Sequence, residues 1–390
     1  MALLFAGNEV SYPGTELKNM KEYKLCVPCL LGLEGPISDE LRRLDIKNIH
    51  NENGRVYFTG SDAEIARANI CLRTGERVLL ELGSFKAETF DELFEGVKAL
   101  PWENIIPRDA AFPVKGYSLN SKLFSVSDCQ SIIKKAIVDR LGSVYGVQWF
   151  PETAETYQIR FSIMKDVASL CIDTTGEGLH KRGYRPAHNA APLKETMAAA
   201  MVMLSRYRGR DDFCDPFCGS GTIPIEAALI AKNRAPGLER DFAAMRWRTL
   251  DSSVWQRERD AARSREFSGS YNILGSDIDP AALRLARENA ERAGVADIVR
   301  FEKADATKFD RKTERGVIVT NPPYGERIME KEEAERLYAA FGEAYRRTEN
   351  WKLYLLSSHT EFERAFGMKA DKKRKLYNGM IKCDLFMYFK

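Results

Sequence analysis

The residues best suited to chemistry lie in three groups between positions 215 and 324, each where a predicted strand ends. The first group follows a strand over 212–215, leads into a helix over 222–233, and reads Asp215-Pro216-Phe217-Cys218-Gly219-Ser220-Gly221. In open α/β sheets, ligands bind at the carboxyl ends of the strands, where glycines allow close approach and helix amides face an anion. Pro224 stands where a dinucleotide fingerprint needs its third glycine, which disfavours NAD. The pattern fits a phosphate or an amino acid carboxylate equally well.

The second group ends a predicted strand over 271–277 and reads Gly275-Ser276-Asp277-Ile278-Asp279-Pro280. An acid at this place commonly accepts hydrogen bonds from ribose hydroxyls, so we expect Asp277, with Ile278 beside it, to bind a nucleoside. Asp279 is expected mainly to cap the helix that opens at Pro280. Asp305, followed by Ala306, ends the strand over 298–304 and is in register to meet an adenine edge; a plain turn former is the alternative.

The third and most specific group is Asn321-Pro322-Pro323-Tyr324, at the end of a predicted strand over 316–320. Two prolines fix an extended turn whose main-chain carbonyl is not consumed by a following helix. Asn321 adds a second carbonyl and Tyr324 an aromatic face. Such a set can accept both hydrogens of a planar amine while stacking on a flipped-out base, although a plain proline turn has the same composition.

These groups must be positioned by the segment after Gly176, where predicted helices and strands alternate regularly. Helices over 193–207, 222–233, 280–293 and 331–347 separate strands over 212–215, 271–277, 298–304, 316–320 and 351–357. Such alternation predicts a mostly parallel sheet with right-handed crossovers. The segment 234–270, with Trp247 and Trp255, interrupts the pattern as an insertion to which the sequence assigns no role.

Two smaller α+β units are predicted before Gly176. The first has strands over 23–30, around a turn at Asn53-Gly54 and over 78–82, and its second helix opens with a capping box at Ser61–Glu64, which together fit a ferredoxin-like unit. The second has a helix capped at Thr89–Glu92, a strand over 111–118, a helix over 127–141 and strands over 157–163 and 167–173. Residues 1–20 are expected to form a flexible extension.

Basic side chains concentrate in the second unit, where they make a candidate surface for phosphate contacts. A basic helix face that is merely solvated is the competing interpretation. The candidate RNA-contacting residues are Lys115, Lys122, Lys134, Lys135 and Arg140.

Composition excludes several classes of protein. The chain has 390 residues, is 44% hydrophobic and carries a net charge of only +3, and its longest apolar runs are too short for a membrane span. The 8 cysteines are scattered through the chain, and we expect reduced thiols and a cytoplasmic location. Cys26 and Cys29 lack a second ligand pair and lie in an apolar run, Leu25 to Leu31, that reads as a buried strand, so no metal site is expected.

Taken together, these residues resemble class I S-adenosylmethionine-dependent N-methyltransferases, in which the glycine-rich loop holds the methionine part and Asn-Pro-Pro-Tyr the target amine. Further segments resemble the THUMP-domain RNA methyltransferases related to the N-terminal half of the bacterial 23S rRNA guanine-N2 methyltransferase. They are the stretches 178–185 and 191–197, the tryptophan-containing insertion and Tyr377-Asn378-Gly379.

The resemblance implies an α/β fold: a Rossmann-like class I methyltransferase domain with a mostly parallel seven-stranded sheet over 176–390, preceded by ferredoxin-like (21–66) and THUMP (67–175) domains. It implies S-adenosylmethionine as cofactor and methylation of a guanine N2 amine, most simply in 23S rRNA or a pre-ribosomal particle. A tRNA guanine-N2 enzyme, a DNA adenine-N6 methyltransferase and a non-catalytic RNA-binding protein remain alternatives. Oligomeric state is left open.

Overall fold

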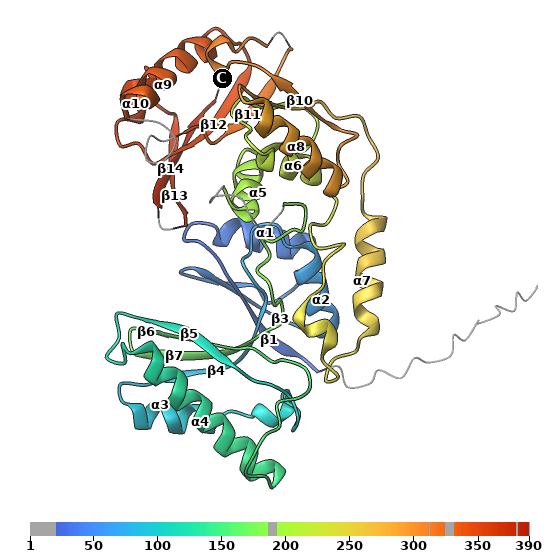
Figure 1. Cartoon of the computed structure of the whole chain (residues 1–390), viewed down its shortest axis with the longest axis vertical. Coiled ribbons are helices and arrows are strands. Elements are labelled where there is room, and N and C mark those ends of the chain that lie inside the picture. The colour runs from blue at the N-terminus through green and yellow to red at the C-terminus, as the bar shows by residue number, and fades with distance from the viewer. Residues whose placement is uncertain (1–20, 186–192, 312, 324–330, 380, 390) are drawn as a thin grey trace, which may run out of the picture.

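The computed structural model describes residues 21–185, 193–311, 313–323, 331–379 and 381–389, which form two seven-stranded sheets with their helices (Figure 1). The extension expected over 1–20 lies outside the described residues. Each predicted fold class is confirmed: a mixed α+β half comes first, and an α/β half follows it.

The first sheet contains strands from both predicted N-terminal units, in the order β2-β3-β1-β4-β7-β6-β5. Neighbouring strands run antiparallel, except that β5 and β6 are parallel. A boundary between residues 66 and 67 would fall inside helix α2, so the division of this half into domains stays a prediction. The elements are β1 (Tyr23–Pro28), α1 (Glu34–Arg43), β2 (His50–Glu52), β3 (Arg55–Gly60), α2 (Asp62–Cys71), β4 (Leu79–Lys86), α3 (Phe90–Lys98), β5 (Val114–Leu119), α4 (Val126–Tyr145), β6 (Ile159–Met164) and β7 (Val167–Asp173).

Helices cover one face of this first sheet and leave the other open. Because side chains alternate along a strand, Ile159, Phe161 and Ile163 of β6 are buried in the same core as residues of α3 and α4. The alternate residue Arg160 of β6 lies in register with Lys115 of β5, on the other face. We call this surface, formed by the alternate residues of the seven strands, the open face; it is where polar groups of this half can meet a partner.

The second sheet has the order β10-β9-β8-β11-β12-β14-β13, in which β14 alone runs against the other strands. This is the mostly parallel sheet that the alternation of helices and strands predicts. The elements are α5 (Glu195–Leu204), β8 (Asp212–Asp215), α6 (Thr222–Ala231), α7 (Ser253–Ser264), β9 (Ile273–Asp277), α8 (Pro280–Arg292), β10 (Val299–Lys303), β11 (Gly316–Thr320), α9 (Lys331–Arg346), β12 (Trp351–Ser357), α10 (Phe362–Phe366), β13 (Lys372–Asn378) and β14 (Ile381–Tyr388).

One predicted strand is too long. The apolar run from Leu25 to Leu31 was expected to be buried throughout, but β1 ends at Pro28 and Leu31 is 52% exposed. Pro28 supplies no ladder donor, and the chain turns there toward α1. Hydrophobicity alone therefore overextends this strand.

The insertion over 234–270 has a structural role that the sequence does not reveal: it packs against the N-terminal half. Its helix α7 lies along α2 (Figure 1), and Arg67 of α2 donates two hydrogen bonds of 2.8 Å to Glu258 of α7. The ring of Trp247 stacks on Tyr157, with centroids 4.5 Å apart. The insertion thus holds the two halves together, because its tryptophans are buried in the hydrophobic core of the N-terminal half.

A buried ion pair joins the halves at a second place. Arg182, in the segment between the two sheets, donates from Nε to Glu226 of α6 at 3.3 Å, and both side chains are no more than 2% exposed. The same guanidinium donates to the main-chain carbonyls of Arg73, in the N-terminal half, and Leu179. Because desolvated charges are costly when unpaired, this contact fixes the N-terminal half against the helix that follows the glycine-rich loop.

We predict that Glu226→Gln lowers the free energy of unfolding by about 3 to 5 kcal/mol, since it leaves the Arg182 charge buried without its counter-ion. Asp39→Asn is the matched control, because Asp39 pairs with Arg42 on the exposed surface and its loss should cost less than about 1 kcal/mol. Denaturant unfolding of both variants measures the difference. Equal stability of the two variants would contradict the structural role given to Arg182.

Candidate active site

The glycine-rich group forms the loop between β8 and α6, as predicted. Asp215 ends β8 and is buried, and its Oδ1 accepts hydrogen bonds from the Phe217 amide (3.1 Å) and the Thr320 hydroxyl (2.6 Å). Gly219 and Gly221 have φ values of +51° and +83°, in the left-handed region that favours glycine. A Cβ on Gly221 would also lie 3.0 Å from the side chain of Ala286, so packing and backbone conformation both require glycine there.

The second group is tied directly to this loop. Asp277, at the end of β9, accepts from the Gly219 amide at Oδ2 (2.9 Å) and from the Asp279 amide at Oδ1 (3.0 Å). The Cys218 amide donates to the carbonyl of Ser276 at 2.9 Å. The two loops therefore form one hydrogen-bonded unit, and a change at Asp277 must also be felt at Gly219.

The neighbours of Asp277 divide as the sequence suggested. Asp279 caps α8 by accepting from the Ala281 amide at 2.8 Å, with Pro280 in the first turn, so the predicted capping role is confirmed. Ile278 is 66% exposed and gives the site an apolar surface. Asp305 accepts from the Thr307 amide and hydroxyl, as a turn former does, yet its carboxylate remains exposed, and Ala306 next to it is buried. Both of the roles weighed for Asp305 thus remain available.

The third group begins directly after β11. Asn321 is half-buried, Pro322 is buried, and the carbonyl of Pro323 accepts a 2.6 Å hydrogen bond from the Tyr338 hydroxyl of α9. This bond holds the turn against α9 and occupies the carbonyl of the second proline. Tyr324 lies outside the described residues.

The sheet order brings the three groups together. Strands β10, β9, β8 and β11 are consecutive neighbours and run parallel, so the residues at or just after their carboxyl ends lie along one edge. Asp305, Asp277, Asp215 and Asn321 are these residues, in that order across the sheet. Thr320, which the sequence analysis overlooked, fastens two of the groups by its bond to Asp215. Its place at the end of a strand, directly before Asn321, is the signal that could have found it.

Arg185 is a second residue that sequence reasoning missed. Its Nη1 donates to the hydroxyl of Thr222, the first residue of α6, at 3.0 Å, and its Nε pairs with Glu195 at 3.1 Å. It belongs to the segment 178–185, whose sequence carried part of the family resemblance. That segment holds the start of the helix that carries the glycine-rich loop.

Burial controls the ionisable groups of the site. The pKa of Asp215 is raised to about 7: burial is the main cause, the hydrogen bonds from Thr320 and Phe217 oppose it, and the charge of Asp277 adds to it. Burial also raises the pKa of Cys214 to about 12 and moves that of Cys218 higher still. Thiols in this state are poor nucleophiles, which argues against a covalent cysteine intermediate.

The predicted basic patch is largely engaged in ion pairs. Lys122 pairs with Glu88, Lys134 with Glu152 and Arg140 with Glu103. Lys135 on α4 lies over the Phe94 ring at 5.8 Å from its centroid, and Lys115 lies on the open face. The structure therefore does not gather the five residues into one free basic surface, and their contact with RNA stays a prediction.

The cysteine pair near the N-terminus shows no metal-binding arrangement. Within the described ranges, no group of three or more His, Cys, Asp or Glu side chains could hold a metal ion. Burial raises the pKa of both Cys26 and Cys29 to about 12. In the same ranges, no helix is long and apolar enough to span a bilayer.

Three family models match the chain in sequence order. The RlmL ferredoxin-like domain matches residues 24–79, the THUMP domain matches 87–173, and the RMKL-like methyltransferase domain matches 182–386. The last match covers more than half of the chain. The two matches before it are a ferredoxin-like and a THUMP domain, in the order in which the sequence predicts them.

Two curated relatives align along most of the chain. YpsC of Bacillus subtilis, provisionally named an RNA methyltransferase, is 44% identical over 95% of this chain and 97% of its own length. The ribosomal RNA large subunit methyltransferase K/L of Psychromonas ingrahamii is 34% identical over 93% of this chain. The chain spans only 49% of that second relative.

Two solved structures share the whole architecture. SMU.472, provisionally named a methyltransferase and solved with SAH, is 41% identical, covers 95% of this chain and 98% of its own, and has a TM-score of 0.89. A Listeria monocytogenes protein, named as a predicted N6-adenine-specific DNA methylase, is 46% identical with the same TM-score and covers 95% and 96% of the two chains.

The raised pKa of Asp215 predicts that its contribution to the free energy of unfolding depends on pH. The pKa of Asp215 is about 7 in the folded protein, whereas its ordinary value is 3.8. Between these two pH values the folded protein keeps a proton that the unfolded chain has lost. The group therefore stabilises the fold at low pH, and that stability is lost as pH rises toward 7. Asp215→Asn keeps the acceptor for Phe217 and Thr320 but cannot ionise. Its unfolding free energy relative to the native chain should rise by about 2 to 3 kcal/mol between pH 5 and pH 8. Denaturant titrations at the two pH values test this, and a pH-independent difference would contradict it.

Proposed function

The chain belongs to the RMKL-like methyltransferase family, and we propose that this S-adenosylmethionine-dependent RNA methyltransferase modifies the exocyclic N2 amine of a guanine in 23S rRNA. The observation that carries the proposal is the placement of Asn321-Pro322-Pro323 directly after β11, the neighbour of the strand that ends at Asp215, at the edge where the glycine-rich loop and Asp277 meet. An amine-binding turn and a nucleoside-binding edge then share one site. The cysteines of the chain are free thiols, which suits a cytoplasmic location, where rRNA is made.

The residues present fit S-adenosylmethionine. The loop Asp215-Pro216-Phe217-Cys218-Gly219-Ser220-Gly221 would hold the methionine part, because its backbone approaches a ligand closely and ends at the amides of α6. Asp277 would accept the ribose hydroxyls, since a carboxylate oxygen that takes one amide keeps further lone pairs. Ile278, Asp305 and Ala306 would surround the adenine. When bound, the cofactor supplies an electrophilic methyl group on a sulfonium.

The chain's own part in the chemistry is to orient the amine. The side-chain carbonyl of Asn321 and the main-chain carbonyl of Pro322 would accept its two hydrogens, because the Pro323 carbonyl already takes the Tyr338 hydroxyl. Both acceptors are held by the turn, so they meet the positive charge that develops on nitrogen without reorganising. Positioning supplies most of the rate, and the proton can leave after methyl transfer, so no strong base is required. Tyr324, outside the described residues, is assigned the stacking role by sequence alone.

RNA is favoured over DNA as the substrate. A THUMP domain matches residues 87–173, and the K/L relative is named for ribosomal RNA. The name of the Listeria relative points to DNA adenine, which the same amine-binding turn could accommodate. The choice of guanine N2 and of 23S rRNA rather than tRNA rests on the family resemblance.

Transfer from labelled S-adenosylmethionine tests the assignment. Unmodified 23S rRNA, tRNA and genomic DNA are offered separately, and the labelled product is digested and identified by mass spectrometry. We predict N2-methylguanosine in 23S rRNA, because the turn accepts an exocyclic amine. N6-methyladenine in DNA, or methylation on a ring carbon or ribose oxygen, would overturn the proposal.

Asn321→Ala should reduce the single-turnover rate about 10² to 10³-fold at saturating cofactor and RNA, the usual effect of removing one preorganised electrostatic partner. Asn321→Asp keeps one acceptor of the same shape and should retain more activity. Cofactor affinity should stay unchanged in both variants, because the proposed contact is to the base. A native rate for Asn321→Ala would exclude the amine-binding role.

Asp277→Ala should weaken cofactor binding by about 1 to 3 kcal/mol, the cost of leaving hydrogen-bonding groups unsatisfied in a closed site. Asp279→Ala is its matched control, since Asp279 caps α8 and should lose only helix stability. Calorimetric titration with S-adenosylmethionine separates the two. Native affinity in folded Asp277→Ala, or an equal loss in the control, would remove Asp277 from the cofactor site.

A further inference from the structure

We infer that Arg77 and Arg160 form a binding site for a backbone phosphate of the RNA substrate, on the open face of the first sheet where the chain leaves it for the second. The inference rests on the proposed function in taking RNA as the substrate. It centres on two arginines that the basic surface predicted from sequence did not include, although Lys115 of that surface lines the same cavity.

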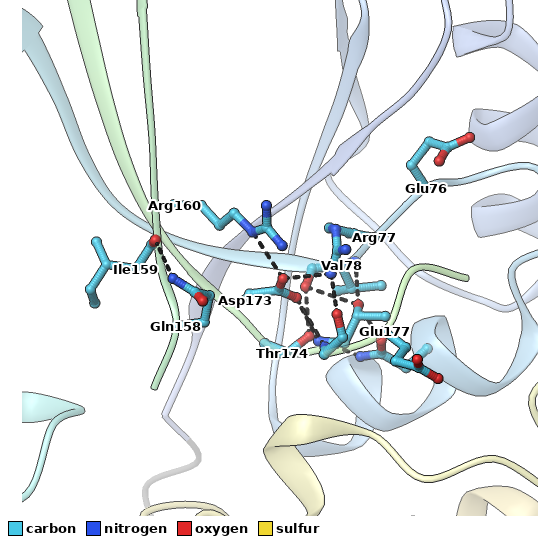
Figure 2. Close-up of polar contacts among 12 residues, drawn as sticks. Glu76, Arg77, Val78, Gln158, Ile159, Arg160, Asp173, Thr174 and Glu177 are labelled. Carbon is cyan, nitrogen blue, oxygen red and sulfur yellow. Dashed lines mark hydrogen bonds and ion pairs between the residues drawn. The ribbon is translucent and has the colours of Figure 1, made fainter. Parts of the chain in front are cut away.

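The site is organised around one buried carboxylate (Figure 2). Asp173, the last residue of β7, is fully buried, and its Oδ2 accepts from Nη1 of Arg77 at 2.6 Å and from Nε of Arg160 at 3.0 Å. Its Oδ1 accepts from the amides of Thr175 (3.0 Å) and Gly176 (3.2 Å). Arg77, just before β4, and Arg160, in β6, therefore converge onto a single anion that the backbone holds in place.

Each guanidinium keeps donors for a ligand. Arg77 also donates to the Gly176 carbonyl, yet its side chain is 23% exposed and that of Arg160 is 30% exposed. A guanidinium has five N–H groups, so Asp173 and Gly176 leave several of them unused. Both side chains line a cavity of about 540 Å³ on the open face. Because Asp173 fixes their orientation in advance, little side-chain entropy is lost when an anion binds.

The other charges around the cavity favour an anion. Lys115 of β5 and Lys181 of the connecting segment line it with the two arginines, and so does His180. The carboxylates facing it are Asp173, already shared by both arginines, and Glu177, which is exposed. Across the described residues, neither Lys115 nor Lys181 has an ion pair, whereas Lys122, Lys134 and Arg140 each do. Two lysines without an ion pair thus lie beside the paired arginines, whereas Lys134 and Arg140 of α4 are engaged by glutamates.

The position of the cavity links it to catalysis. Glu76, the neighbour of Arg77, accepts from the Thr196 hydroxyl of α5 at 3.1 Å and pairs with Lys194 at 3.3 Å. Arg77 is therefore adjacent to a contact that joins the two halves. A phosphate bound there would be held in a fixed position relative to the sheet that carries Asn321.

The test measures binding of an unmodified 23S rRNA transcript as a function of salt. Lys115→Ala/Lys181→Ala removes two cations while leaving Asp173 paired, and Arg160→Gln removes one guanidinium while keeping a donor for Asp173. Each should weaken binding about tenfold at 0.15 M salt and lower the slope of log affinity against log salt by about one per lost phosphate contact. S-adenosylmethionine affinity should not change.

The matched control is Lys21→Ala/Lys47→Ala, which lowers the net charge equally at two exposed positions of the same half that lie outside both the cavity and the predicted basic surface. It should alter affinity less than twofold. Two results would overturn this inference alone, provided that the native protein still methylates the RNA. One is native affinity and slope in the lysine double variant, and the other is an equal loss in the control. A native protein that neither binds nor methylates any RNA would overturn the proposed function and this inference together.

Discussion

The buried ion pair between Arg182 and Glu226 is the contact that ties the N-terminal sheet to the helix of the glycine-rich loop. Neither residue is more than 2% exposed, so each charge requires the other. Arg182 also donates a hydrogen bond to the main-chain carbonyl of Arg73, in the N-terminal half, and Glu226 lies in the second turn of α6. The N-terminal sheet is thus anchored to the helix whose first residues close the glycine-rich loop. The proposed function, in which the N-terminal half holds the RNA that the second half methylates, requires this fixed relation.

Side-chain hydrogen bonds also connect the strand ends at the edge of the second sheet. Thr320 bonds to Asp215, and Asp277 bonds to Gly219, so three strand ends are connected through side chains rather than through long loops. Burying Asp215 raises its pKa to about 7, which is the cost of using a carboxyl group as a structural acceptor at this edge. The exposed groups beside it, Ile278 and Asp305, are left for a ligand.

Local patterns in the sequence predicted much of this. Capping boxes at Ser61–Glu64 and Thr89–Glu92 begin α2 and α3 as expected, and Asp279 caps α8, because these signals act within one helical turn. The parallel sheet followed from its alternation of helices and strands. By contrast, the packing of Trp247 on Tyr157 and the convergence of Arg77 and Arg160 on Asp173 join residues far apart in the chain. Lys134 and Arg140 looked free in sequence because their glutamates lie on other elements.

The central claim is that a platform joined rigidly to the catalytic sheet presents a guanine of 23S rRNA to Asn321. Its most direct test is mass-spectrometric mapping of methylated nucleosides in 23S rRNA from cells of the source organism with the gene deleted and restored. The account predicts that one guanine loses its N2-methyl group on deletion, regains it with the native gene and does not regain it with Asn321→Ala. Unchanged 23S rRNA, with a methyl group missing instead from tRNA or DNA, would contradict it.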